Sequence, residues 1–499
     1  MSLALVASRA LIGLDALEVR VEVHLANGLP AFNLVGMPET AVRESRDRVR
    51  SALLTAGFEF PARRITVNLS PADLPKEGGR YDLPIALGIL VASKQLPQSS
   101  LNGREFIGEL ALNGELRPVK GVLPTAIATS KVNKSLILPT DNLAEAGLVS
   151  NLKVGGASHL LEVAAALSGQ AELLEPGRIT PQADPLNYTD LLEVKGQQAA
   201  KRALMLAAAG QHNLLFCGPP GSGKTLLARC LPGLLPEPSE EEALEVAAVQ
   251  SIVQGFDTQG WRQRPFRSPH HTSSAVALVG GGSNPMPGEI SLAHRGILFL
   301  DELPEFGRQV LEVRREPLEA GVIHLARAKR KTTYPAQFLL IAAMNPCPCG
   351  HLGDPRKACT CAPGLISRYQ SRLSGPLLDR IDLHLEVPAL PADCLWEPAE
   401  GDSSATVRGK VEQARQRQME RCGKPNALLT PAELEVFAPL GKEQQQLLTR
   451  AMNKIHLSAR AAHRIIKVAL TLADLDAKPK IASNHLLEAL SYRKLPWSD

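Results

Sequence analysis

The segment GPPGSGKT at positions 218–225 combines residue types that can bind the phosphates of a nucleotide. Its glycines let backbone N–H groups curl around phosphate oxygens, where a Cβ would interfere. Lys224 would reach the β- and γ-phosphates, and the Thr225 hydroxyl would coordinate Mg²⁺. An apolar run at 213–217 precedes the segment and a helix start at 226–229 follows it, which is the order that such a site requires. The sequence therefore predicts a phosphate-binding loop formed by Gly218, Pro219, Pro220, Gly221, Ser222, Gly223, Lys224 and Thr225.

Asp301 and Glu302 follow a second apolar run, Gly-Ile-Leu-Phe-Leu at 296–300. Consecutive apolar residues of this kind are typical of a strand covered on both faces in a parallel sheet. Adjacent carboxylates at a strand end point in different directions, so Asp301 can hold Mg²⁺ through water while Glu302 orients the attacking water. Together with the phosphate loop, the pair predicts a site that hydrolyses ATP. A purely structural acidic pair is the alternative.

Four cysteines form two Cys-x-Cys pairs across a short polar loop: Cys347 with Cys349, and Cys359 with Cys361. Four thiolates can close a tetrahedral Zn²⁺ shell and fix a loop that has no core of its own. His351 could replace one of these ligands. Four protein ligands leave no open position, so the predicted zinc is structural rather than catalytic. Reduced cysteines without a metal are the alternative.

Two further segments carry residues of functional interest. His270 and His271 have no acidic or cysteine partner at metal-ligand spacing, so we expect them in a structural or substrate-facing loop. Residues 322–334 have the pattern of a hairpin, and its tip collects Arg327, Lys329, Arg330 and Lys331. A positive loop of this kind would follow the phosphates of DNA without reading bases. An ordinary solvated basic turn is the alternative.

The composition of the chain is that of an ordinary globular protein. Its 499 residues exceed the size of one core and predict about two to four domains. The net charge of +4 neither requires nor excludes nucleic acid. No apolar run approaches the roughly 18 residues of a membrane span, so no membrane partner is expected. Arg9, Asp15 and Glu18 interrupt the N-terminal apolar residues, which argues against a signal or transit peptide and favours a cytoplasmic location.

Residues 1–170 are predicted to form a mixed α/β or α+β domain. Polar and apolar residues alternate with a period of two in the expected strands 17–25 and 65–69. Helical spacing of apolar residues predicts helices at 41–57 and 81–93.

This region resembles the Lon-protease-like (S5-type) fold found at the front of magnesium-chelatase-related proteins. The resemblance rests on GRYDLPIAL at 79–87 and GELALNGELRPVKG at 108–121. It places the peptidase serine at Ile85 and the peptidase lysine at Thr125. A Ser–Lys dyad needs a nucleophile and a base, so the resemblance implies a scaffold or binding module. The neighbouring Lys120 is expected to be a surface lysine.

The remaining chain divides into a linker, a motor and a lid. Proline, glycine and polar residues predict a linker at 171–187, and the motor is expected at 188–392 with the possible zinc loop at 347–361. Residues 397–499 are predicted to be helical, with helix-start signals at Thr430 and Ser458. The expected fold class is α/β: a P-loop parallel-sheet core with a helical lid, preceded by the α+β domain.

These motifs together resemble the ComM/YifB family of magnesium-chelatase-like AAA+ ATPases. In related ATPases, the VKGQ box at 194–197 lines the adenine. The resemblance makes Asn345, which ends an apolar run, the first sensor of the γ-phosphate; a residue that only begins a turn is the alternative. It makes Arg380 an arginine finger supplied to a neighbouring subunit, with Arg368 and Arg372 as competitors.

In the lid, the resemblance makes Arg460 the second sensor, with Arg464 as the fallback and a plain surface arginine as the alternative. A finger acting in trans requires a ring, and the family resemblance implies a hexamer. It also implies movement on DNA, with branch migration in homologous recombination during natural transformation, alongside recombination proteins. Two alternatives remain: a chelatase-like motor that remodels a protein or metal-insertion partner, and an ATP-dependent peptidase, which Ile85 and Thr125 argue against.

Overall fold

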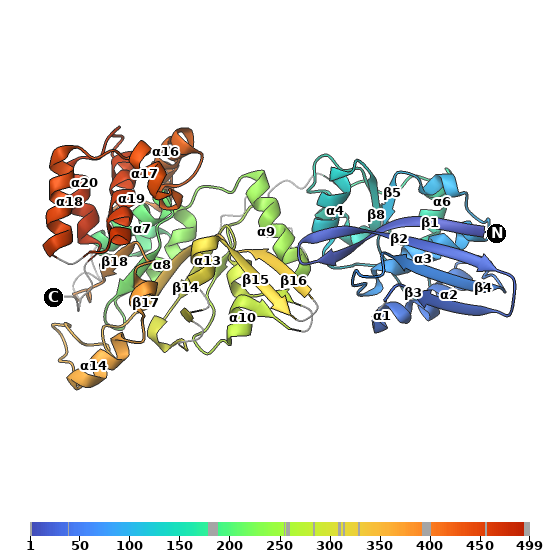
Figure 1. Cartoon of the computed structure of the whole chain (residues 1–499), viewed down its shortest axis with the longest axis horizontal. Helices are drawn as coiled ribbons and strands as arrows, with labels where there is room; N and C mark the ends of the chain where they lie inside the picture. Colours follow the sequence, from blue (N-terminus) through green and yellow to red (C-terminus); the bar gives the residue numbers. More distant parts are fainter. Residues whose placement is uncertain are drawn as a thin grey trace.

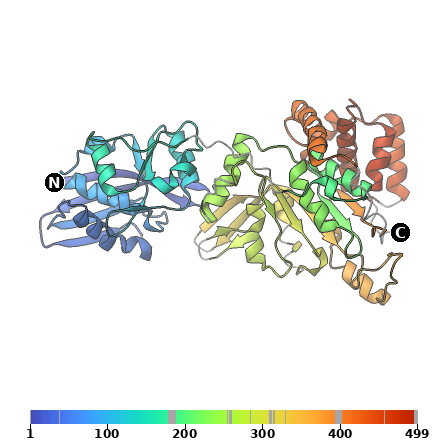
Figure 2. The same ribbon diagram turned by 180° about the vertical axis from the view of Figure 1, so that it is seen from behind.

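The computed structural model describes residues 2–37, 39–177, 188–253, 255, 260–282, 285–307, 311–312, 315–327, 330–391, 401–454 and 457–493. The molecule is elongated, with an N-terminal domain at one end and a bundle of C-terminal helices at the other (Figure 1). A second sheet lies between them, and the view from behind shows the same order (Figure 2). The predicted linker at 171–187 lies outside the described residues from 178 onward.

The N-terminal domain is built on a seven-stranded mixed sheet in the order β3-β4-β2-β1-β5-β8-β9. The predicted strands are confirmed: alternate residues are buried on one face, and those on the other face are at least partly accessible. The strands span Ser2–Ile12 (β1), Asp15–Ala26 (β2), Ala31–Val35 (β3), Arg64–Ser70 (β4), Arg104–Phe106 (β5), Ser135–Pro139 (β8) and Val154–Ala157 (β9). The short strands β6 and β7, Glu109–Leu110 and Leu116–Arg117, pair separately.

One helix of this domain, α3 at Asp82–Ala92, is buried along its whole length. It confirms the helix predicted at 81–93. The helix predicted at 41–57 is two helices, because the chain breaks at Glu44 between Thr40–Arg43 (α1) and Ser45–Thr55 (α2). The other helices are Val122–Lys131 (α4), Leu143–Ala146 (α5) and Leu160–Leu167 (α6).

The central sheet has five parallel strands in the order β11-β14-β17-β10-β18. Strands β10, β14 and β17 are wholly buried, which is why their sequences are continuous apolar runs. Because all strands are parallel, their carboxyl ends lie at one edge, where such sheets bind ligands. The strands span Leu214–Cys217 (β10), Phe266–Arg267 (β11), Ile297–Leu300 (β14), Leu339–Met344 (β17) and Leu383–Glu386 (β18).

Helices and small hairpins surround this sheet. The helices are Gln198–Gly210 (α7), Lys224–Cys230 (α8), Glu240–Val253 (α9), Ala275–Val279 (α10), Glu289–Leu292 (α11), Arg315–Ala320 (α13), Pro363–Gln370 (α14) and Gly375–Leu378 (α15). Strands β12 and β13, Gly280–Gly281 and Met286–Pro287, form one hairpin. The hairpin predicted at 322–334 is confirmed as Val322–Arg327 (β15) and Arg330–Pro335 (β16).

The C-terminal helices share one hydrophobic core with strands of the central sheet. The predicted helix starts are confirmed, because the Thr430 and Ser458 hydroxyls each accept a hydrogen bond from a backbone N–H of the first turn. The helices span Ser404–Cys422 (α16), Pro431–Phe437 (α17), Lys442–Lys454 (α18), Ala459–Leu475 (α19) and Ser483–Ser491 (α20).

Helix α4 of the N-terminal domain packs on α9 of the central domain. Leu123 and Leu148 form a small apolar cluster with Ala247 and Ala248. The Ser251 hydroxyl contacts the Glu145 carboxylate of the N-terminal domain, and other hydrogen bonds cross the boundary from Gly121 and Leu123 to Ser251 and from Lys120 to Val253. Lys120 is exposed, as predicted, and its ammonium lies 3.0 Å from the Val253 carbonyl.

Candidate ATP-hydrolysis site

The phosphate loop joins the end of β10 to the start of α8, at the carboxyl edge of the central sheet. Gly221 and Gly223 have φ values of +75° and +90°, a region that glycine adopts without strain. The Lys224 ammonium lies inside the loop and donates to the carbonyls of Gly218 and Pro219, at 2.7 and 2.9 Å. The sequence therefore folds this segment into the strand–loop–helix unit that it predicts.

Lys224 also links the loop to the neighbouring strand. Its ammonium is 3.2 Å from Oδ1 of Asn345, which directly follows β17. Burial lowers the pKa of Lys224, and the nearby Asp301, Cys217 and Glu302 oppose that shift. The structure therefore brings Asn345 next to the lysine of the phosphate loop.

Thr225 and Asp301, the expected Mg²⁺ ligands, lie next to each other. The Thr225 hydroxyl donates to Oδ2 of Asp301 at 2.9 Å. Thr225 is in the first turn of α8 and Asp301 directly follows β14, so the adjacent ends of two elements bring them together. A hydroxyl and a carboxylate are the hard oxygen ligands that Mg²⁺ prefers.

Glu302 turns away from Asp301. It has a left-handed backbone, with φ +51° and ψ +48°, which costs about 1–2 kcal/mol for a non-glycine residue. Strained backbone of this kind is concentrated at functional sites. Its carboxylate lies 3.0 Å from Nδ1 of His271, and the two side chains are 51% and 31% exposed.

The His271 contact is a site feature that the sequence reasoning missed. His271 lies on the loop after β11 and packs against His270 and the edge of Phe306. No fixed spacing connects it to Glu302. The usable signal was that its loop follows a strand of the same parallel sheet, whose carboxyl ends converge.

The VKGQ box also reaches the phosphate loop. The side-chain amide of Gln197 donates to the carbonyls of Ser222 and Pro388, at 3.2 and 2.7 Å. Gln197 therefore connects the segment before α7 with both the phosphate loop and the chain beyond β18.

The cysteines of the two Cys-x-Cys pairs converge just beyond Asn345. Their four sulfur atoms lie within 4.8 Å of one another, with recorded Sγ–Sγ distances of 3.4, 3.6 and 3.6 Å. A tetrahedral Zn²⁺ with Zn–S bonds of about 2.3 Å separates its sulfurs by about 3.8 Å. The cluster can therefore hold a metal with little adjustment. His351 is not part of it, because its Nδ1 faces the Asp354 carboxylate at 3.2 Å.

The three arginines considered as fingers differ in their surroundings. Arg380 is only 9% exposed; it donates to the Pro376 carbonyl at 2.6 Å and pairs with Glu319 of its own subunit. Arg372 pairs with Glu305 at 2.9 Å. Arg368 is exposed on α14, which projects from the central domain (Figure 1). The structure does not bring Arg380 to Lys224, and a role in a neighbouring subunit stays a prediction.

The two lid arginines considered for the second-sensor role also differ. Arg460 is exposed in the first turn of α19. Arg464 pairs at 2.5 Å with the buried Asp382, which also accepts from the Asn213 backbone N–H at 3.0 Å. Burial alone would raise the pKa of Asp382, but Arg464 and His212 hold it well below its usual range. Arg464 therefore fastens the lid to the sheet in this conformation.

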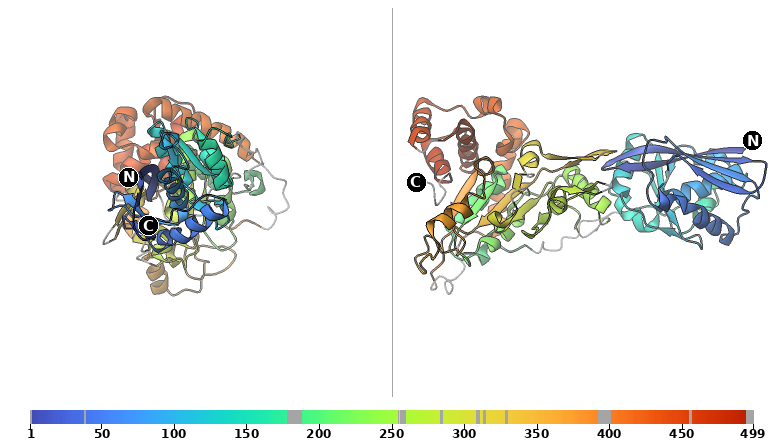
Figure 3. Two further views of the ribbon diagram at one scale, coloured as in Figure 1. Left: turned by 90° about the vertical axis from the view of Figure 1, so that its right-hand side faces the viewer. Right: turned by 60° about the horizontal axis from the view of Figure 1, so that its bottom comes forward.

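The basic hairpin extends toward the N-terminal domain, as Figure 3 shows. Lys331 is exposed, whereas Thr332 is buried next to Gly13 in the turn between β1 and β2. The Tyr334 hydroxyl donates to the Pro285 carbonyl at 2.8 Å. Lys329 and the side chains of Arg327 and Arg330 lie outside the described residues.

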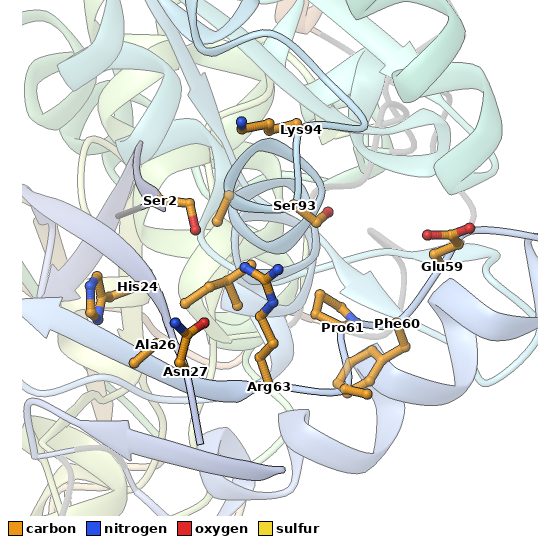
Figure 4. A pocket seen from close by; sticks show the side chains of 13 residues that line it. Ser2, His24, Ala26, Asn27, Glu59, Phe60, Pro61, Arg63, Ser93 and Lys94 are labelled. Carbon is orange, nitrogen blue, oxygen red and sulfur yellow. The ribbon is translucent and has the colours of Figure 1, made fainter. Parts of the chain in front are cut away.

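The N-terminal domain holds no dyad at the two positions where the resemblance placed one. Ile85 is fully buried, and the buried Thr125 hydroxyl donates to the Gly121 carbonyl at 3.0 Å. A cavity of about 870 Å³ opens at the end of this domain that is remote from the central sheet. Figure 4 shows Arg63 and Lys94 among the side chains that line it. All lining residues lie between positions 2 and 94, so this cavity is separate from the phosphate loop. Among the helices that the structure describes, none has the length and apolar character needed to cross a membrane.

Three family profiles match separate stretches of the chain. "Subunit ChlI of Mg-chelatase" matches residues 21–142 in the N-terminal domain. "Magnesium chelatase, subunit ChlI" matches 190–395, which includes the phosphate loop, the acidic pair and the cysteine cluster. "Magnesium chelatase, subunit ChlI C-terminal" matches 401–493 in the lid.

Individual relatives cover nearly the whole chain. Competence protein ComM of Haemophilus influenzae is 53% identical over 99% of this chain and 98% of its own length. YifB of Escherichia coli is 50% identical over 99% of this chain and 98% of its own. The magnesium-chelatase 67 kDa subunit of Chlorobaculum parvum is 26% identical over 32% of this chain and 23% of its own length. The site geometry and these full-length similarities show that the chain belongs to the ComM/YifB family of magnesium-chelatase-like AAA+ ATPases.

Proposed function

We propose that this protein is a ring-forming ATPase, hexameric by family resemblance, that moves on DNA and promotes branch migration. The observation that carries the proposal is the convergence of Lys224, Thr225, Asp301 and Asn345 at one edge of a parallel sheet, beside Glu302. The similarity to a protein named for competence supports a role in natural transformation. The further proposal of homologous recombination in the cytoplasm, with recombination proteins as partners, rests on the family resemblance alone.

In the proposed mechanism, the loop amides and Lys224 bind the phosphates, and Thr225 with Asp301 would hold Mg²⁺. Mg²⁺, when bound, would neutralise charge that develops on the phosphate oxygens. Glu302 would orient the attacking water, which requires its carboxylate to leave His271. Asn345 would contact the terminal phosphate from the end of β17, the strand between β10 and β14, and Arg460 would approach it from the lid.

A guanidinium from the neighbouring subunit would complete the site. A finger role for Arg380 requires its pair with Glu319 to open on assembly. Arg368 needs no such opening, because it is already exposed on α14. Mixing alanine variants of each arginine with wild-type subunits distinguishes Arg380 from Arg368. The variant that lacks the finger should lower the ATPase activity of mixed rings by more than the fraction of variant subunits in them.

The DNA contact is assigned to the basic hairpin formed by β15 and β16. Within the part of the hairpin that the structure describes, Lys331 is exposed and would contact the phosphates. This assignment predicts binding that weakens steeply with salt and depends little on sequence. The cysteine cluster is assigned to a structural Zn²⁺, because four clustered thiolates form a closed shell. Metal analysis of the purified protein tests it, with one zinc per chain as the expected result.

The function is tested by ATP turnover with forked or four-way DNA, with unfolded polypeptide and with a chelatase partner protein. We expect stimulation by DNA. The chelatase-like alternative is favoured by the similarity to a magnesium-chelatase subunit over 32% of the chain. Stimulation by the partner or by polypeptide alone would overturn the DNA assignment.

A further inference from the structure

The loop that carries the cysteine cluster packs directly against the phosphate loop. Gly350 has φ +82°, and a Cβ at this position would lie 2.5 Å from Cδ and 2.7 Å from Cγ of Pro220. Contacts this short essentially never occur, so there is no room for a side chain between Gly350 and the Pro220 ring. The proline ring is rigid and cannot turn aside as a flexible side chain would.

The cysteine loop has no regular secondary structure to hold it in this position, although Gln370 donates to the Pro346 carbonyl at 3.0 Å and Asp354 pairs with His351 and Arg356 within the loop. Between Asn345 and α14 the chain forms neither helix nor strand, and most of its side chains beyond Gly350 are exposed. The Gly350 N–H donates to the Cys347 carbonyl at 3.0 Å. Cys347 and Cys349 lie three residues and one residue before Gly350, while Cys359 and Cys361 come from the returning segment. A bond network through the four sulfurs would therefore fix Gly350 against the phosphate loop.

We propose that a metal ion held by the four cysteines positions the phosphate loop for nucleotide, with Gly350 as the residue that transmits its effect to Pro220. This inference rests on the proposed ATPase function and assigns the metal a role in nucleotide binding. Loop amides bind phosphate well only if they are held in place beforehand. Asn345 also links the cysteine loop to the nucleotide site, because the cysteine loop begins immediately after it. The Cγ of Asn345 lies 3.8 Å from the Cβ position of Gly350.

A matched pair of glycines tests the contact. Gly353 lies in the same loop with φ +77°, but a Cβ there has nothing within 4 Å. Gly350→Ala and Gly353→Ala therefore incur similar backbone strain, and only the first pushes on Pro220. With the full-length chain, we measure bound metal and the equilibrium affinity for a fluorescent ATP analogue with Mg²⁺. We expect both variants to retain the metal, and only Gly350→Ala to weaken binding, by about tenfold.

Two further measurements separate a specific effect from misfolding. The effect of Gly350→Ala should be smaller in a Pro220→Ala background, because the ring atoms that the new Cβ meets are gone. The double variant Cys359→Ser with Cys361→Ser should lose the metal and bind the analogue about tenfold more weakly. Normal nucleotide affinity in a metal-free chain would overturn the inference, and so would equal losses in the two glycine variants. Wild-type turnover stimulated by DNA tests the proposed function separately, since it does not depend on how these variants bind.

Discussion

Replacing His271 with alanine should raise basal ATP turnover about two- to fivefold. The His271 and Glu302 side chains lie 3.0 Å apart but are 31% and 51% exposed, so their contact is screened by solvent. A pair of this kind is worth about 0.5–1 kcal/mol, and 1.4 kcal/mol corresponds to a factor of ten. In the proposed mechanism, Glu302 orients the attacking water only when its carboxylate is free of His271. Removing the imidazole therefore increases the fraction of chains with a productive carboxylate.

The assay is steady-state phosphate release without DNA, followed by the same measurement with four-way DNA. DNA should stimulate His271→Ala less than the wild type, because the variant already lacks the contact that restrains Glu302. His270→Ala is the matched control, since His270 Nδ1 contacts the Thr272 hydroxyl at 2.8 Å and the adjacent His271 makes the Glu302 contact. A fall in basal turnover of about tenfold or more would refute the reasoning. An equal rise in His270→Ala would refute it as well.

Three more predictions concern the lid, the boundary between the N-terminal and central domains, and the proposed Mg²⁺ ligand Asp301. Arg464→Ala should destabilise the lid by about 2–3 kcal/mol, less than a fully buried pair because Arg464 is 26% exposed. The pKa of Asp382 is held low in the fold, so the stability that its charged form contributes is present above about pH 4 and is lost as the pH falls further. Urea unfolding should therefore show a smaller loss of stability in Arg464→Ala at pH 3.5 than at pH 7. Ser251→Ala leaves the buried Glu145 carboxylate with one partner fewer and should cost about 1–3 kcal/mol, seen as faster amide exchange in α4 with unchanged exchange in the lid. Asp301→Asn should raise the Mg²⁺ concentration needed for half-maximal turnover several-fold, whereas an unchanged Mg²⁺ requirement would remove Asp301 from the metal site.

Much of the central domain could be predicted from sequence because its signals are local. Continuous apolar runs identified β10, β14 and β17, since strands covered on both faces have no polar side. The phosphate loop needs glycines at fixed spacing, and helix starts need capping side chains such as Thr430. Because parallel strands end at one edge, the order of the motifs also predicted which side chains would meet.

The contacts that escaped prediction are those made by the tertiary fold. His271 reaches Glu302 only because β11 and β14 are neighbours in the sheet. Arg380 lies in a sequence that suits an exposed finger, yet Glu319 pairs with it from a helix far away in the chain. The Gly350 contact with Pro220 follows from the path of a loop without regular structure. None of these contacts has a periodicity or spacing that a sequence can display.

The central claim is tested most directly by ATP turnover of the wild-type protein and of Glu302→Gln, each with and without four-way DNA. The replacement keeps the shape of the side chain and removes only the carboxylate charge. We expect DNA to stimulate the wild type, and Glu302→Gln to bind nucleotide normally but to turn over about a hundredfold more slowly. Undiminished turnover by Glu302→Gln would contradict the assignment of this site, and a wild-type rate indifferent to DNA would contradict its proposed use.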